Sequence, residues 1–234
     1  MRWKSGWTIG VLAVLFVAAA IISKGVAGPE PAVVIPAPAF NDAKAAGPLQ
    51  TAVLAGGCFW GVQAVYQHVR GVRNAVSGYS GGEKSTAEYE TVSGGNTGHA
   101  ESVAVTYDPK EITYGEILQI YFSVAHNPTE LNRQGPDTGT QYRSDIFYST
   151  ESQKKIADAY IAQLTKAKVF SKPIVTRVDK LKAFYPAEDY HQDFLINNPR
   201  HPYIVANDIP KVENLKKLFS TNYLVQPVTV RAAK

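Results

Sequence analysis

The chain has little of the residue types that build disulfide scaffolds and metal clusters: its 234 residues include one cysteine and one methionine. A single cysteine excludes an internal disulfide framework and any metal site that needs several cysteine ligands from this chain. The five histidines show no H-E-x-x-H or comparable ligand spacing, so we expect no bound metal. Hydrophobic residues make up 45% of the chain, which argues against global disorder. The length fits one folded domain with appendages.

The folded part also has almost no net charge. The chain contains 24 Lys and Arg against 20 Asp and Glu. Three of the basic residues, Arg2, Lys4 and Lys24, precede Gly28 in a stretch without any acidic residue, so 21 basic residues face 20 acidic ones in the remainder. This balance gives no electrostatic support to a nucleic-acid partner, and we expect none.

Residues 1–27 have the pattern of an export signal. Arg2 and Lys4 are followed by an apolar stretch at residues 8–22 and by small residues up to Ala27, a plausible cleavage point. The apolar stretch is short for a membrane span, which favours a cleaved signal, and the alternative is an uncleaved N-terminal anchor. Both interpretations place the body outside the cytoplasm, in the periplasm, with no membrane contact beyond this segment.

Five prolines among alanine and valine in residues 28–48 favour an extended tether. The alternative is that part of it, residues 33–35 or Phe40, packs on the domain surface. We expect one folded domain at residues 49–220, a C-terminal tail at 221–234, and a monomer.

Strand and helix patterns alternate through the domain. Short apolar or alternating runs predict strands, and apolar residues at helical spacing predict helices. A loop as long as residues 127–141 is usually functional. Strands are expected at residues 51–55, 72–79, 101–107, 144–148 and 174–178, and helices at 59–69, 114–124, 151–166 with Thr150 as its cap, and 187–196. This order predicts an α+β fold, a two-layer sandwich of helices on a mixed sheet.

The one cysteine, Cys58, lies in Gly56-Gly57-Cys58-Phe59-Trp60-Gly61, between a predicted buried strand and the start of a helix. Backbone N–H groups at a helix N-terminus stabilise a thiolate, so we expect a lowered thiol pKa and a nucleophilic sulfur. The alternative is an inert buried cysteine, although a lone thiol is a liability in an oxidising compartment. Phe59 and Trp60 are candidates for an apolar wall around a small substrate group, with core packing as the alternative for Phe59.

Further polar candidates come from other parts of the chain. Glu101 follows the glycine-rich Gly94–Ala100 stretch and shares a strand face with two valines, where apolar surroundings raise a carboxyl pKa and make it a general acid. The alternative is a strand-end residue in solvent. The long loop supplies Asp137 and the hydroxyl of Tyr142, and another cluster, residues 190–194, lies on the last predicted helix.

Three motifs together resemble the peptide methionine sulfoxide reductase family of the A type. They are Gly57-Cys58-Phe59-Trp60-Gly61, Gly94-x-x-x-Gly98-His99-Ala100-Glu101, and Gly139-Thr140-Gln141-Tyr142-Arg143-Ser144. The resemblance covers about residues 52–218. It implies a sandwich related to the ferredoxin-like arrangement, and reduction of the S epimer of methionine sulfoxide, free or in proteins, without a metal or bound organic cofactor.

By this resemblance Cys58 is the nucleophile and Glu101 the acid. Phe59 and Trp60 would hold the substrate methyl group, and Tyr89, Asp137 and Tyr142 would bind or orient the sulfoxide oxygen. The product on cysteine is a sulfenic acid, which a reductant must return to thiol.

The chain departs from many relatives in two places. It has no further cysteine near its C-terminus, so an external thiol must attack Cys58 directly, either a thioredoxin-like protein, a glutaredoxin or a small thiol. Phe194 stands where relatives often have tyrosine, which removes any hydroxyl role there. An alternative function is an exported cysteine acyltransferase or peptidase, which needs a histidine such as His99 or His191 within hydrogen-bond reach of Cys58.

Overall fold

A computed structural model describes Met1 and residues 32–230 of the chain. Its centre is a six-stranded sheet of order β7-β6-β1-β3-β2-β8, antiparallel throughout except between β6 and β7. A separate two-stranded hairpin, β4–β5, lies in the long loop. The strands are β1 (Gln50–Gly56), β2 (Val72–Ser80), β3 (Ala100–Tyr107), β4 (Arg133–Gln134), β5 (Asp137–Thr138), β6 (Ser144–Tyr148), β7 (Arg177–Lys180) and β8 (Phe184–Pro186).

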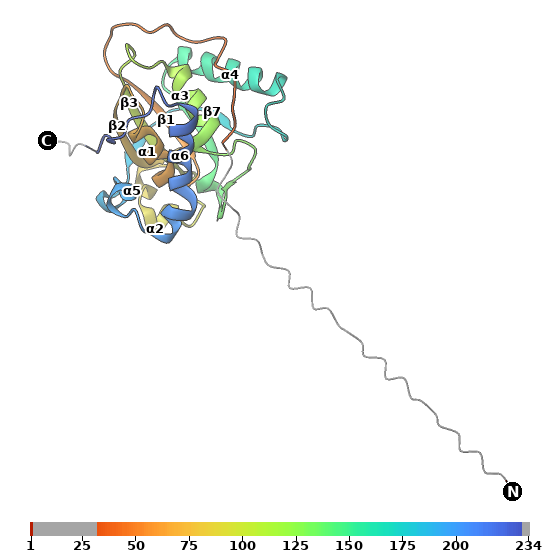
Figure 1. Ribbon diagram of the computed structural model, residues 1–234. Helices are drawn as coiled ribbons and strands as arrows, with labels where there is room; N and C mark the ends of the chain where they lie inside the picture. The colour runs from red at the N-terminus through yellow and green to blue at the C-terminus, as the bar shows by residue number, and fades with distance from the viewer. Residues whose placement is uncertain (2–31, 231–234) are drawn as a thin grey trace.

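Helices pack mainly on one side of this sheet (Figure 1). They are α1 (Phe59–Gln67), α2 (Tyr89–Val92), α3 (Tyr114–Ile120), α4 (Glu151–Lys166), α5 (Phe194–Asn197) and α6 (Ile209–Leu218), with π-helical turns at Tyr121–Ala125 and Ile204–Asp208. The main hydrophobic core joins strand residues such as Leu54 and Val103 to these helices, whereas the opposite sheet face has a small cluster around Val53 and Phe147. The predicted α+β class, a mixed sheet with packed helices, is confirmed.

Local sequence signals explain where two of the helices begin. Thr150 caps α4 as predicted, because its side chain accepts a hydrogen bond from the Gln153 N–H. Thr113 and Glu116 form a complete capping box at the start of α3. The helix predicted at 114–124 is α-helical only to its seventh residue and then widens into the buried π-helical turn.

Two predicted elements are wrong in extent. The helix expected at 187–196 is broken, because Gln192 is extended and uses its side-chain amide to bond both the N–H and the carbonyl of Ser77 in β2. Asp193 then adopts a left-handed conformation before α5 starts. The strand expected at 174–178 begins and ends later in the chain: it is β7 (Arg177–Lys180), which pairs in parallel with β6.

Residues 33–35 of the proline-rich segment pack on the domain, the second of the two interpretations above. Ile35 is 6% exposed and belongs to the main core. Its carbonyl accepts a hydrogen bond from Gln119 Nε2, and the N–H of Val33 donates to the Ser123 carbonyl. Phe40 is 54% exposed, so it contributes little burial. In Figure 1 the later part of the segment, in orange, arches over the top of the molecule.

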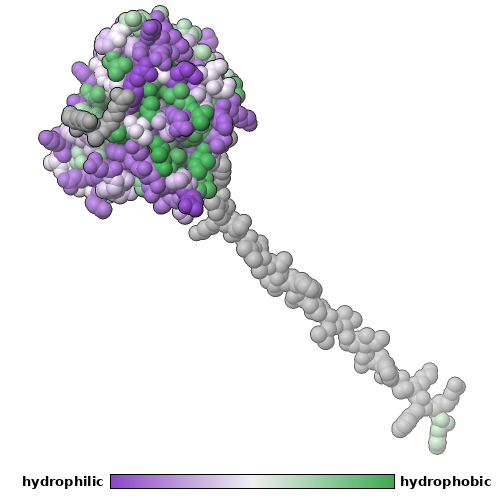
Figure 2. Space-filling model, turned by 60° about the vertical axis from the view of Figure 1, so that its left-hand side comes forward, coloured by the Kyte–Doolittle hydropathy of each residue, from purple (hydrophilic) through white to green (hydrophobic). Residues whose placement is uncertain are grey.

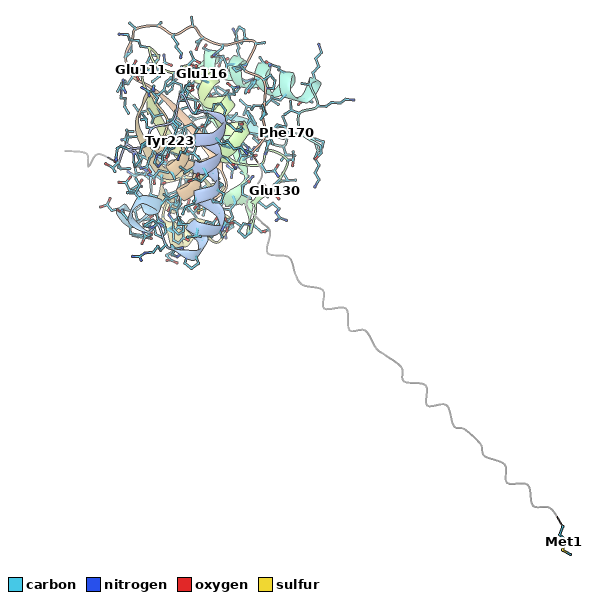
Figure 3. All side chains as sticks on the ribbon, in the orientation of Figure 1. Met1, Glu111, Glu116, Glu130, Phe170 and Tyr223 are labelled. Atoms are coloured by element: carbon cyan, nitrogen blue, oxygen red, sulfur yellow. The ribbon has the colours of Figure 1, made fainter. Side chains whose placement is uncertain are left out.

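Residues 221–230 lie against the end of α1. The ring of Tyr223, labelled in Figure 3, stacks on His68 with ring centroids 5.4 Å apart, and the Leu224 N–H donates to the His68 carbonyl. The predicted export signal at 1–27 lies outside the described residues, apart from Met1. None of the helices in the described part is long and apolar enough to cross a membrane.

The surface is polar with exposed apolar positions. Figure 2 shows hydrophobic residues gathered at the centre of one face and bordered by hydrophilic ones. Exposed large hydrophobic side chains include Val34, Phe40, Leu49, Leu131, Tyr190, Val205 and Val225.

Candidate active site

Cys58 lies at the turn from β1 into α1, where it is the N-cap residue of the helix. Gly57 before it has φ of +85°, and a Cβ there would lie 2.3 Å from Gln134 Cγ. Only glycine fits this left-handed, crowded position. The turn leaves the cysteine 9% exposed at the start of the helix.

Glu101 meets the cysteine from β3. Its Oε2 accepts a hydrogen bond of 2.9 Å from the N–H of Phe59, the residue that follows Cys58. Its side chain shares the buried strand face with Val103 and Val105 and is 3% exposed. The predicted inward orientation is confirmed, and the alternative of a strand-end residue in solvent is wrong.

All the predicted site residues line one cavity of about 140 Å³. A larger hollow of about 710 Å³ near Gly98 and Lys182 contains none of them. The small cavity is lined by Cys58, Phe59, Trp60, Tyr89, Glu101, Asp137, Tyr142 and Tyr203. Residues from five separate parts of the chain thus surround one thiol.

The Trp60 indole forms a wall of the cavity and is held on two sides. Its ring stacks on Phe194 with centroids 3.7 Å apart and planes at 5°. Its Nε1–H donates to His191 Nδ1 at 3.2 Å, which requires that nitrogen to be unprotonated. Phe59 is 1% exposed, so it packs in the core and also lines the cavity.

Tyr203 was missed by the sequence analysis. Its hydroxyl donates a hydrogen bond to Asp137 Oδ2 across the cavity. It precedes α6, a helix absent from the predicted elements, although Pro210 at its start and the apolar Val212 and Leu215 are signals for one. Tyr142 reaches the same cavity from a 3₁₀ turn, Thr140–Tyr142, in the long loop.

Burial controls the protonation of the acid and the thiol. Loss of water raises the pKa of Glu101 to about 8, although the Phe59 N–H opposes the shift, so the carboxyl is neutral at pH 7. Burial, then the charges of Glu101 and Asp208, raise the pKa of the Cys58 thiol well above its usual value. The predicted lowering of the thiol pKa is therefore wrong for the free protein, because one N–H at the helix terminus, that of Trp60, does not offset burial. The resting site holds both a thiol and a neutral acid.

The arrangement does not supply the imidazole that an acyltransferase or peptidase requires. No histidine is among the residues that line the cavity of Cys58. His191 Nδ1 already accepts from Trp60, and His99 bonds to the backbone of Gly82 and Glu83.

Comparisons with known proteins agree with these motifs. A sequence model of the peptide methionine sulfoxide reductase family matches residues 50–223. A protein from Mesorhizobium japonicum named peptide methionine sulfoxide reductase MsrA 2 is 64% identical over 192 residues, which cover 82% of this chain and 98% of that protein. A protein of the same name from Synechocystis is 52% identical over 177 residues, covering 76% and 83%.

Solved structures give the same result. Reduced Mxr1 of Saccharomyces cerevisiae superposes with a TM-score of 0.59 at 36% identity, covering 65% of this chain and 87% of that one. Methionine sulfoxide reductase A of Corynebacterium diphtheriae superposes with a TM-score of 0.57 at 31% identity, covering 75% and 88%. The chain therefore belongs to the peptide methionine sulfoxide reductase family.

Proposed function

We propose that Cys58 attacks the sulfur of methionine sulfoxide, which the enzyme reduces to methionine. The observation that carries the assignment is the Cys58–Phe59–Glu101 arrangement, in which a neutral carboxyl is hydrogen-bonded to the residue next to a buried thiol. The reaction is an oxidoreduction between the thiol and the sulfoxide. The methyl sulfoxide group of the substrate is small, so it suits the small cavity around Cys58.

Glu101 supplies the proton that the sulfoxide oxygen needs as its bond to sulfur weakens. The Cys58 sulfur first bonds to the methionine sulfur. This S–S bond then breaks, its electron pair stays on the methionine sulfur, and the hydroxyl group formed from the sulfoxide oxygen passes to the Cys58 sulfur. The methionine sulfur thereby gains two electrons and the Cys58 sulfur loses two. The product on Cys58 is a sulfenic acid, and the hydrogen of its hydroxyl group is the proton that Glu101 gave to the sulfoxide oxygen. The thiol proton restores Glu101, so no net proton is consumed in this half of the cycle.

The remaining cavity residues orient the substrate. Phe59 and Trp60 provide the apolar wall for the methyl group, and Tyr89, Asp137 and Tyr142 face the oxygen, directly or through water. An apolar pocket on one side and hydroxyl donors on the other fix the handedness at sulfur. This division supports selectivity for one epimer, which the resemblance to the family identifies as S.

The test is reduction of separated S and R methionine sulfoxides by purified protein with dithiothreitol. Reduction of the S epimer alone is expected, and equal use of both would contradict the orientation. A Cys58→Ser variant is expected to be inactive. Activity in that variant would overturn the assignment of the nucleophile.

We propose that an external thiol reduces the sulfenic acid, because Cys58 is the chain's one cysteine. The first thiol displaces water and forms a mixed disulfide, and a second thiol releases Cys58. The donor is a thioredoxin-like protein, a glutaredoxin or a small thiol. Without reductant, about one methionine per enzyme is expected, set by a single sulfenic acid. A burst of two would contradict this one-cysteine cycle.

We also propose that the enzyme is exported. The basic Arg2 and Lys4, the apolar stretch at 8–22 and the small residues up to Ala27 support this. The mass of the protein recovered from the periplasm tests cleavage after Ala27, and membrane recovery of the full chain would favour an anchor. Recovery from the cytoplasm alone would contradict export.

A finer proposal concerns the fold. Strand order β6-β1-β3-β2, with every neighbouring pair antiparallel and helices after β1 and β3, supports a ferredoxin-like unit at the centre of the sheet.

A further inference from the structure

A buried carboxylate outside the cavity lining has no role in the scheme above. Asp208 ends the π-helical turn before α6 and is 0% exposed. Neither of its oxygens has a hydrogen-bond partner among the described residues. Its neighbouring charge is Lys211, whose Nζ lies 3.6 Å from Asp208 Oδ1 and whose side chain is 11% exposed. A carboxylate buried without hydrogen bonds is costly, so its retention calls for a physical reason.

The pair lies against the first turn of α1. A Cβ on Gly61 would lie 2.2 Å from Asp208 Oδ1 and 3.0 Å from Lys211 Nζ. Gly61 is three residues after Cys58 and ends the cysteine motif. Its missing side chain therefore makes room for an ion pair directly behind the reactive turn.

The groups that face Cys58 are mostly acids. Its titratable neighbours are Glu101 of β3, Asp137 of β5, Tyr89 of α2, Tyr142 of the 3₁₀ turn, Tyr203, and Asp208. Burial raises the pKa of both Asp137 and Asp208, and Lys211 of α6 is the cation that opposes the rise in each. Removing the charge of Asp208 thus leaves the Lys211 ammonium, which lies against Gly61 in the first turn of α1, without its counterion.

We propose that Asp208 and Lys211 are positioning residues for the reduction step: as a compensated pair packed against Gly61, they set the charge that the Cys58 sulfur experiences as it becomes anionic. The inference rests on the proposed role of Cys58 as nucleophile. Ionised Asp208 cancels the ammonium of Lys211, so the pair gives the Cys58 thiolate no net stabilisation. Neutral Asp208 leaves the ammonium to stabilise the thiolate.

The experiment measures the rate of Cys58 alkylation by iodoacetamide against pH, which reports the thiolate fraction without requiring reductase activity. Asp208→Asn, which has nearly the same shape, is expected to alkylate about three- to tenfold faster than wild type at pH 7, equal to a thiol pKa lowered by about half a unit to one unit. The double variant Asp208→Asn/Lys211→Met is expected to return to within about twofold of the wild-type rate. An Asn variant with the wild-type rate, or single and double variants altered alike, would overturn the proposal.

A second alkylation experiment, on Lys211 variants, covers the case in which Asp208→Asn does not fold. At about pH 9, where Asp208 is ionised, Lys211→Met is expected to alkylate about three- to tenfold more slowly than wild type, because the carboxylate is then uncompensated. Lys211→Arg keeps the charge and should keep the rate. An unchanged rate in the Met variant overturns the proposal. Reductase activity of the wild-type protein, assayed in parallel, tests the proposed function separately.

Discussion

Replacing Glu101 by glutamine tests two properties of this side chain separately: its role as proton donor and its effect on the free energy of unfolding. The amide keeps the size of the side chain and can still accept the hydrogen bond of the Phe59 N–H. It cannot donate an acidic proton to the sulfoxide oxygen. We expect reductase activity to fall by about 10²- to 10⁴-fold, the usual contribution of general acid catalysis.

The same substitution is expected to stabilise the protein. The pKa of Glu101 is raised to about 8 from 4.5. A carboxyl group whose pKa is higher in the folded protein than in the unfolded chain contributes its full stabilisation at pH values below the unfolded pKa. That stabilisation is lost as pH rises through the folded pKa. Relative to an amide, the wild-type carboxyl therefore costs about 1 kcal/mol at pH 5 and about 3 kcal/mol at pH 7.

Urea unfolding of the wild type and the Gln variant at pH 5 and pH 7 tests this magnitude. The variant's advantage in the free energy of unfolding should grow by about 2 kcal/mol between the two pH values. An advantage independent of pH would refute the reasoning, since it would mean that Glu101 ionises normally in the folded protein. Unchanged activity would refute its role as the acid.

Three further predictions follow from the same structure. In the wild type, kcat/KM is expected to fall as pH rises above about 8, because Glu101 loses its proton; a profile flat to pH 10 would contradict this. His191→Phe removes the acceptor of the Trp60 indole and should lower kcat/KM about tenfold, whereas His201→Phe, at the edge of the same ring, should have little effect. Ile35→Ala should lower the free energy of unfolding by about 2–4 kcal/mol in urea, while exposed Val34→Ala should change it by less than about 0.5 kcal/mol; equal effects would mean that the segment does not pack on the core in solution.

The sequence by itself predicted the fold class and most of the residues that line the cavity around Cys58. Period-two and period-3.6 patterns depend on which face of an element is buried, so they predicted the strands around Glu101 and the helix that follows Cys58. Glycine at a position such as Gly57 marks a turn that other residues do not adopt easily. The motifs around these residues therefore predicted the nucleophile, the acid and the aromatic wall.

Tertiary structure decided what depends on contacts between distant segments. Tyr203 enters the cavity, and Asp208 comes to lie behind the cysteine, only because α6 packs on α1. The helix expected at 187–196 breaks where Gln192 finds backbone partners in β2. The protonation of Cys58 was predicted with the wrong sign, since local sequence shows the helix terminus but not the depth of burial that opposes it.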